Sequence, residues 1–147
     1  MQFSYKRYLG PRGDIERPVI PITLRNLHQP LAPAIGYHGL VDSGSDRCIF
    51  SSQVAELLDI DLTATDAVVH VAGVVAGERR PIYLHPIGIE VGDAGGPVVE
   101  TLVGFMPDFS QSGQALLGRR GFFDQFSFVK FKDVDGLLEI GALRRKL

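Results

Sequence analysis

The sequence predicts an all-β fold, a compact closed barrel or sandwich with one or two short helices. Short runs rich in apolar and β-branched residues recur along the chain at near-regular spacing. Glycine and proline clusters separate these runs, and short helices are expected only over residues 51–58 and 120–125. The chain has 147 residues, 45% of them hydrophobic, which is enough for one domain with a substantial core. We therefore expect residues 1–147 to form a single domain.

Three strands are predicted in the N-terminal third of the chain. Residues 3–9 alternate between apolar and polar, and a glycine- and proline-rich turn follows them. Residues 18–24 are rich in β-branched side chains, but Pro18 and Pro21 lie among them, which predicts an edge strand or a bulged one. Residues 34–41 form the third strand, which leads directly into Asp42.

One short helix is predicted over residues 51–58, packed on the sheet. Ser51 or Ser52 can act as its N-cap, because a hydroxyl oxygen accepts a hydrogen bond from the first free backbone N–H groups of a helix. The apolar residues expected on one face of this helix are Val54, Leu57 and Leu58.

The remainder of the chain is predicted to be strands joined by turns. Residues 67–71 and 81–91 are expected to form a hairpin around a loop with two glycines, and residues 92–97 form a clear turn. Further strands are expected at residues 98–105, 126–131 and 137–140.

Composition and charge exclude several classes of function. The formal net charge is −2, from 15 basic and 17 acidic residues, so no basic surface for nucleic acid or an anionic membrane is expected. No apolar run approaches the length that spans a membrane, and the first residues lack the apolar core of a signal peptide. Cys48 is the only cysteine, so no intramolecular disulfide can form, and we expect a small buried side chain there. A cytoplasmic protein with no nucleic-acid or membrane partner is the expectation.

Metal and cofactor chemistry have little support in the sequence. The histidines are scattered and form no His-Glu-x-x-His or Cys/His cluster, so no metal is expected. The glycines around residues 72–77 match neither a dinucleotide-binding nor a P-loop pattern, and no cofactor is expected. The four histidines are His28, His38, His70 and His85.

The segment Leu40-Val41-Asp42-Ser43-Gly44-Ser45 is the strongest candidate for chemistry. A strand end holds a carboxylate rigidly, Gly44 lets the backbone turn sharply, and the Ser43 hydroxyl can fix the local geometry. Asp-Ser-Gly is also ordinary turn composition, so this segment alone favours a plain Asx-turn.

A second segment, Ala115-Leu116-Leu117-Gly118-Arg119, is again a short apolar run that ends in glycine. Together the two segments resemble the retropepsin-like family of aspartic proteases, in its catalytic signature and its later apolar-apolar-Gly-Arg signature. The resemblance extends over nearly the whole chain and implies a closed retropepsin-like β-barrel that hydrolyses peptide bonds. The chain has Ser43 where the family more often has threonine, and Arg120 where it usually has aspartate or asparagine.

The number of candidate carboxylates predicts a homodimer. Aspartic proteolysis needs two carboxyl groups that share a proton, one acting as a base and the other as an acid. The other Asp-x-Gly segment, Asp93-Ala94-Gly95, lacks the hydroxyl residue and is predicted to be a turn. The second carboxylate must then come from Asp42 of a second copy, on a twofold axis.

The resemblance also implies roles for the residues around Asp42. The two Asp42 side chains would hold the attacking water, Ser43 would brace the pair, Gly44 would allow close approach, and Ser45 would hydrogen-bond the outer carboxylate oxygen. The loop between the predicted strands 67–71 and 81–91 falls where the family has its flap, which closes over an extended peptide substrate. The flap residues are expected to be Ala72, Gly73 and Val74, and the second motif is Leu117, Gly118 and Arg119.

Two other interpretations stay open. One is a catalytically silent dimer of the same fold that binds extended peptides or serves in assembly. The other is an unrelated β-barrel in which Asp42 only caps a turn.

Overall fold

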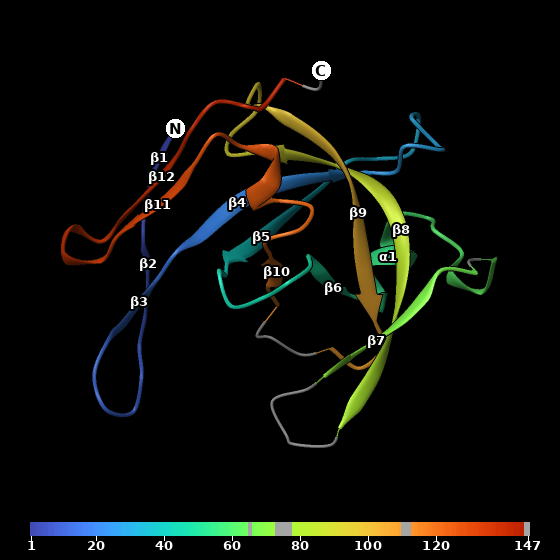
Figure 1. The fold of residues 1–147 in the computed structure, drawn as a ribbon, viewed down its shortest axis with the longest axis horizontal. Helices are drawn as coiled ribbons and strands as arrows, with labels where there is room; N and C mark the ends of the chain where they lie inside the picture. The colour runs from blue at the N-terminus through green and yellow to red at the C-terminus, as the bar shows by residue number, and fades with distance from the viewer. Residues whose placement is uncertain (65, 73–77, 110–112, 146–147) are drawn as a thin grey trace.

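Six strands close into a barrel in the computed structural model, which describes residues 1–64, 66–72, 78–109 and 113–145. β4 and β8 pair with each other and so close the barrel (Figure 1). This arrangement confirms the predicted closed all-β fold. In their order around the barrel the strands are β4 (Val19–Arg25), β5 (Ile35–Val41), β10 (Ala115–Leu117), β6 (Ile49–Ser51), β9 (Val98–Met106) and β8 (Arg79–Val91).

Most neighbouring strands of the barrel are antiparallel, but two pairs are parallel. β10 runs parallel to β5, and β6 runs parallel to β9. One further strand, β7 (Val68–Ala72), pairs with β8 outside the closed ring. The parallel pairs bring together segments that are far apart in the sequence, including the two predicted motifs.

The prediction that residues 18–24 form an edge or bulged strand is wrong. β4 pairs with β5 on one side and with β8 on the other. The prolines fit because Pro18 precedes the strand, and the ladder with β8 begins only at Ile22. Pro21 contributes its carbonyl, which accepts a hydrogen bond of 2.9 Å from the Gly92 N–H. Neither proline therefore removes an N–H that the ladder needs.

The predicted helix is present as α1 (Ser52–Leu57), with Ser51 as its N-cap. The Ser51 hydroxyl accepts a hydrogen bond of 3.3 Å from the Gln53 N–H. The predicted apolar face is wrong in one position, because Leu57 is 66% exposed. The helix packs on β6 and β9 through Val54, Ala55 and Leu58, so Ala55 is buried where Leu57 was predicted to be.

The two ends of the chain meet in a separate three-stranded sheet. β1 (Gln2–Ser4) pairs antiparallel with β12 (Leu137–Ile140), which also pairs with β11 (Val129–Lys132). Three short 3-10 helices lie in connections between strands: η1 (Leu62–Ala64), η2 (Phe123–Gln125) and, between β11 and β12, η3 (Asp133–Asp135).

The predicted first strand is divided at Tyr5 into β1 and β2 (Lys6–Tyr8). The Tyr5 N–H donates to the Gly136 carbonyl at 2.7 Å, and its hydroxyl donates to Asp133 Oδ1 at 2.5 Å. These contacts hold the chain beside the β11–β12 hairpin at the point where it leaves the terminal sheet.

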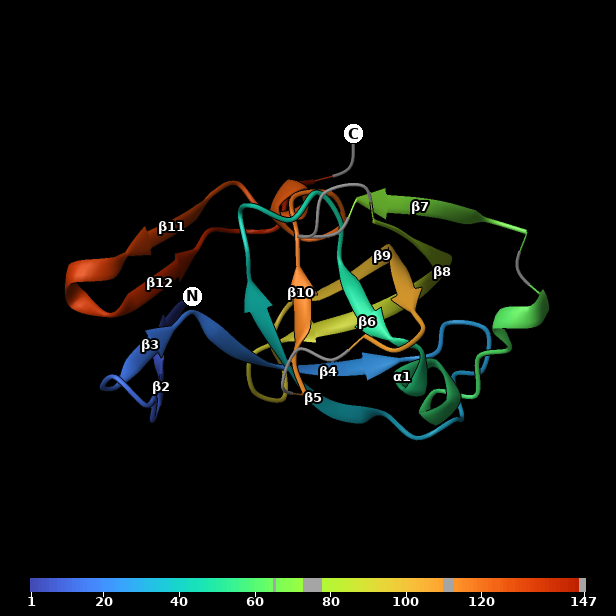
Figure 2. The same ribbon diagram turned by 90° about the horizontal axis from the view of Figure 1, so that it is seen from below.

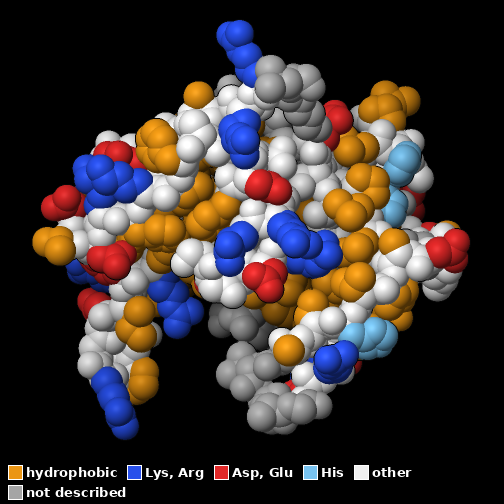
Figure 3. Space-filling model, viewed as in Figure 1, with side chains coloured by type: hydrophobic (Ala, Val, Ile, Leu, Met, Phe, Trp, Pro, Cys, Tyr) orange, Lys and Arg blue, Asp and Glu red, His pale blue; other side chains and the backbone are white. Residues whose placement is uncertain are grey.

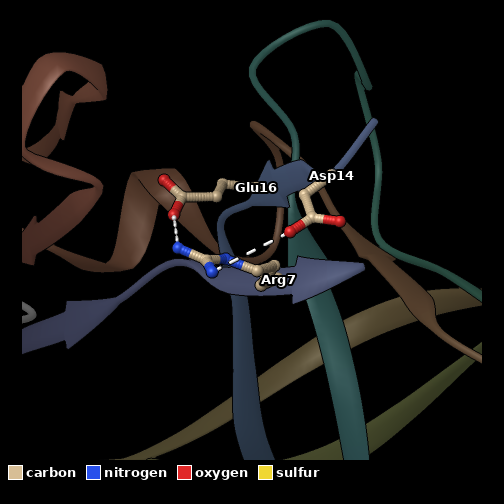
Figure 4. Close-up of polar contacts among 3 residues, drawn as sticks. All are labelled: Arg7, Asp14 and Glu16. Carbon is tan, nitrogen blue, oxygen red and sulfur yellow. Dashed lines mark hydrogen bonds and ion pairs between the residues drawn. The ribbon is translucent and has the colours of Figure 1, made fainter. Parts of the chain in front are cut away.

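β2 and β3 (Ile15–Arg17) form a separate two-stranded hairpin. This hairpin and the β11–β12 hairpin project from the same side of the barrel (Figure 2). Arg7 on β2 lies 3.5 Å from Glu16 and 3.8 Å from Asp14 (Figure 4). Such exposed ion pairs each contribute about 0.2–1 kcal/mol, so they reinforce the backbone pairing only modestly.

The main core fills the barrel and continues under the terminal sheet. It includes fully buried side chains from β4, β8 and β9, together with Phe50, Phe122 and Leu138. A second, smaller hydrophobic cluster forms around the buried residues Ile49, Ile82 and Met106, from β6, β8 and β9.

Candidate active site

The parallel pairing of β5 and β10 places the two sequence motifs side by side. Val41 is opposite Leu117 in the register. The next residue, Asp42, donates its backbone N–H to the Leu117 carbonyl at 3.0 Å. Asp42 and Gly118 therefore both follow directly after neighbouring strands, although 75 residues separate them in the sequence.

The loop after β5 holds the Asp42 carboxylate by its own backbone. The Gly44 N–H donates to Asp42 Oδ1 at 2.8 Å, and the Ser45 N–H donates to the Asp42 carbonyl at 3.2 Å. A Cβ atom at Gly44 would lie 3.2 Å from Oδ1, closer than most real contacts. Asp42 is half-buried. The loop is thus an Asx-turn that also orients a carboxylate at the end of a strand.

The two serines of this loop have different positions. Ser43 is exposed, and its predicted bracing of a second copy remains a prediction. In the single protomer the Ser45 hydroxyl donates to the Arg47 carbonyl at 2.8 Å, and its hydrogen bond to the Asp42 carboxylate in a dimer stays a prediction. Ser45 lies beyond the Asx-turn, where its side chain closes the next turn of the loop.

Gly118 is required by close packing against the same loop. A Cβ atom at this position would lie 2.3 Å from the Arg47 carbonyl oxygen and 2.7 Å from that of Ser45. The following N–H groups bind the loop directly: Arg119 donates to the Ser45 carbonyl and Arg120 to the Asp46 carbonyl, both at 2.9 Å. The second motif therefore supports the first through its backbone.

Cys48 lies next to this support and is fully buried. Its Sγ atom is 3.8 Å from the Arg120 carbonyl oxygen. Burial raises the pKa of the thiol to about 12. Because a nucleophilic cysteine reacts as the thiolate, Cys48 has a structural role near neutral pH.

Asp42 lies in a cleft of about 1240 Å³. Figure 1 places the loop after β5 and the segment after β10 near the middle of the view. Figure 3, drawn from the same side, shows charged side chains near the middle of this face and hydrophobic ones on both sides of them. The polar lining includes Asp42, Gly44, Ser45, Asp46, Arg47, His70, Glu78, Arg80, Asp108, Arg119, Arg120 and Asp124.

Most of the apolar lining comes from the smaller hydrophobic cluster. Ile49, Met106 and Leu116 belong to it or pack against it, and all three line the cleft. Val69 and Val71 of β7 pack on the same cluster. The cleft therefore offers an apolar wall beside a fixed carboxylate, which suits an extended chain with apolar side chains.

β7 supplies the described part of the predicted flap. Ala72 is the last residue of this strand and lines the cleft. The other two predicted flap residues, Gly73 and Val74, lie outside the described residues. β7 pairs only with β8 among the described strands, so within the described part of the chain its outer edge has no strand partner.

Several cleft residues have no counterpart in the sequence prediction. Arg47, Arg80, Asp108 and Met106 line the cleft with Asp42, although none of them belongs to a motif. Of these four residues, only Arg47 could be anticipated from the sequence, because it lies close to Asp42 in the chain.

The other Asp-x-Gly segment forms the expected turn, in which the Gly96 N–H donates to the Asp93 carbonyl at 3.1 Å.

Within residues 1–64, 66–72, 78–109 and 113–145, no group of three His, Cys, Asp or Glu side chains is placed to hold a metal ion. No helix in the described part of the chain has the length and apolar character needed to cross a membrane.

Comparison with solved structures identifies the fold. The chain is similar to a retropepsin-like aspartic protease from Rickettsia conorii, with a TM-score of 0.57 and 16% sequence identity. The similarity covers 95% of this chain and 89% of that protein. No family model matches the sequence, and no curated protein matches it. At this identity the similarity shows the fold alone, which is retropepsin-like as the two motifs predicted.

Proposed function

We propose that the chain is an aspartic endopeptidase that acts as a homodimer, with one Asp42 from each copy in a shared site. The observation that carries this proposal is the placement of Asp42. Its carboxylate accepts a hydrogen bond from the Gly44 N–H, and the loop that carries it packs against Gly118. Asp42 also lines a cleft with an apolar wall. The retropepsin-like fold supports the same conclusion.

The proposed reaction needs both carboxyl groups in different protonation states. The ionised Asp42 takes a proton from water, and the water oxygen forms a bond to the carbonyl carbon of the peptide. The protonated Asp42 of the other copy donates its proton to the carbonyl oxygen. The tetrahedral intermediate then collapses: the C–N bond breaks as the carboxyl group that gained the water proton donates it to the leaving amine, and the other carboxylate takes a proton from a hydroxyl of the intermediate.

A second copy completes the site because one protomer supplies a single suitable carboxylate. The other acidic residues of the cleft lining are engaged elsewhere or lie on other segments. Asp46 faces Arg119 at 4.0 Å, and Asp124 accepts a hydrogen bond from the Gly121 N–H at 3.0 Å. Two Asp42 carboxylates on a twofold axis would share one proton, since like charges so close cannot both be ionised.

The substrate in this proposal is an extended segment of a peptide or protein. The outer edge of β7 can pair with such a segment by strand addition, while the apolar wall receives its side chains. The flap would then cover the substrate and exclude water.

The test compares wild type with Asp42→Asn and with a matched control, Asp93→Asn, which changes the exposed Asp-x-Gly turn. Each purified dimer is incubated with a denatured protein mixture from acidic to neutral pH, and new peptide ends are counted by mass spectrometry. We expect cleavage by wild type and Asp93→Asn and none by Asp42→Asn. Equal cleavage by all three would show that Asp42 is not the catalyst. Inactivity of all three as folded dimers would favour a peptide-binding module.

A further inference from the structure

Two arginines lie next to each other in the cleft beside Asp42. Arg47 and Arg120 form a parallel β-bridge, reinforced by the hydrogen bond of 2.9 Å from the Arg120 N–H to the Asp46 carbonyl. Directly paired residues on adjacent strands point to the same face. Both arginines accordingly line the same cleft as Asp42.

This bridge carries two positive charges on neighbouring residues. Like charges on directly paired residues repel each other, and neither guanidinium has a carboxylate partner among the described residues. The other two arginines of the cleft do have partners: Arg119 faces Asp46 at 4.0 Å, and Arg80 faces Glu78 at 3.3 Å. The bridge therefore holds two positive charges together without a protein anion to balance them.

The remaining acidic groups of the cleft do not fill this role. Asp124 binds the Gly121 N–H and the Gln125 side chain, at 3.0 Å and 2.9 Å. Asp108 follows the end of β9, on a different segment from the bridge. Asp42 is held by the Gly44 N–H and faces the cleft. A ligand that brings its own anion would relieve the repulsion between Arg47 and Arg120.

We propose that Arg47 and Arg120 select substrates with an anionic side chain close to the scissile bond. Guanidinium groups bind carboxylates through paired, charge-assisted hydrogen bonds, so Asp or Glu residues are the expected ligands. This inference rests on the proposed dimeric protease. In a symmetric dimer the two arginine pairs lie on opposite sides of the shared site, so the preference applies to both sides of the cleaved bond.

The first experiment measures kcat/KM for three fluorogenic peptides that differ only at the positions flanking an apolar central pair, which are Glu, Gln or Lys. Wild type should prefer the Glu peptide to the Lys peptide by about tenfold or more. The preference should fall below about twofold in R47Q/R120Q and reverse in R47E/R120E. A phosphoserine peptide shows whether a phosphate is preferred to a carboxylate.

The matched control is R144Q/R145Q, which removes the same charge from two exposed arginines that do not line the cleft. It should keep the wild-type preference. R47Q/R120Q should also unfold at the same temperature as wild type or a higher one, because it removes two like charges that have no carboxylate partner among the described residues. Equal cleavage of the Glu and Lys peptides by wild type would overturn the proposal. Equal loss of preference in R144Q/R145Q would also overturn it.

A binding measurement separates this inference from the proposed activity. Asp42→Asn removes the proposed catalyst and leaves the arginines in place, so peptide affinity can be followed by fluorescence anisotropy without cleavage. We expect tighter binding of the Glu peptide, which weakens with added salt and is lost when R47Q/R120Q is combined with Asp42→Asn. If the Glu peptide binds more tightly in this way but wild type cleaves no peptide, the proposed protease activity is refuted and the anion preference stands. If wild type cleaves peptides but shows no preference for the Glu peptide, the protease activity stands and the role of the two arginines is refuted.

Discussion

Replacing Gly118 with alanine should destabilise the fold through the loop that carries Asp42. The added Cβ atom would lie 2.3 Å from the Arg47 carbonyl oxygen and 2.7 Å from the Ser45 carbonyl oxygen, where ordinary contacts are 3.4–4 Å. Both oxygens belong to the backbone, so no side chain can rotate away to make room. The loop itself must move by roughly 1 Å.

The expected size of the effect follows from the contacts that such a movement breaks. Overpacking of this kind destabilises by about 1–3 kcal/mol. The same two oxygens accept hydrogen bonds, from the Ser45 hydroxyl at 2.8 Å and the Arg119 N–H at 2.9 Å. Each bond contributes about 1 kcal/mol. The total is about 4 kcal/mol, which for a chain of this length lowers Tm by about 8–16 °C.

Urea unfolding of wild type and Gly118→Ala measures this loss directly. The matched control is Gly36→Ala, because Gly36 lies in β5, the strand that carries Asp42, and an added Cβ there meets nothing within 4 Å. The control should stay within about 1 kcal/mol of wild type. If Gly118→Ala were as stable as Gly36→Ala, the proposed support of the Asp42 loop by Gly118 would be refuted.

Three other predictions concern single side chains. Ser45→Ala should lose the hydrogen bond to the Arg47 carbonyl and about 1 kcal/mol of unfolding free energy; unchanged urea unfolding would contradict this. Cys48, whose pKa burial raises to about 12, should resist iodoacetamide in the native protein at pH 8 and react in denaturant; rapid native labelling would show that the thiol is accessible. Burial and the Asp133 carboxylate raise the pKa of Tyr5 to about 12, so the native state favours the protonated phenol. Wild type should be more stable than Tyr5→Phe below about pH 10 and lose this advantage as the pH rises through about 12, whereas a constant difference would contradict the assignment.

Much of the fold could be predicted because its longer strands carry their own pattern. The strand predicted over residues 34–41 is observed as Ile35–Val41, and the strand over 137–140 has the predicted bounds. β6 was missed because three residues are too few to show a period of two. Its extended conformation comes from pairing with β9 and β10, which a local pattern cannot reveal.

The candidate site was predictable only where a motif marks it. Asp42 and Gly118 stand in recognisable segments, so their proximity could be anticipated from the family resemblance. The pairing of Arg47 with Arg120 depends on how the segment after β10 crosses the Asp42 loop, and no sequence period records it. Leu57 was wrongly predicted to be on the buried face for a related reason: contacts with β6 and β9 determine which face of the helix packs.

The most direct test of the account mixes wild type with Asp42→Asn, allows the subunits to exchange, and measures peptide cleavage at constant total protein. If each site needs Asp42 from both copies, activity should fall as the square of the wild-type fraction, because only wild-type homodimers are active. A linear fall would mean that each protomer acts independently through its own Asp42, and a fall slower than linear would mean that one Asp42 suffices in a shared site; either result would contradict the proposed shared pair of carboxylates.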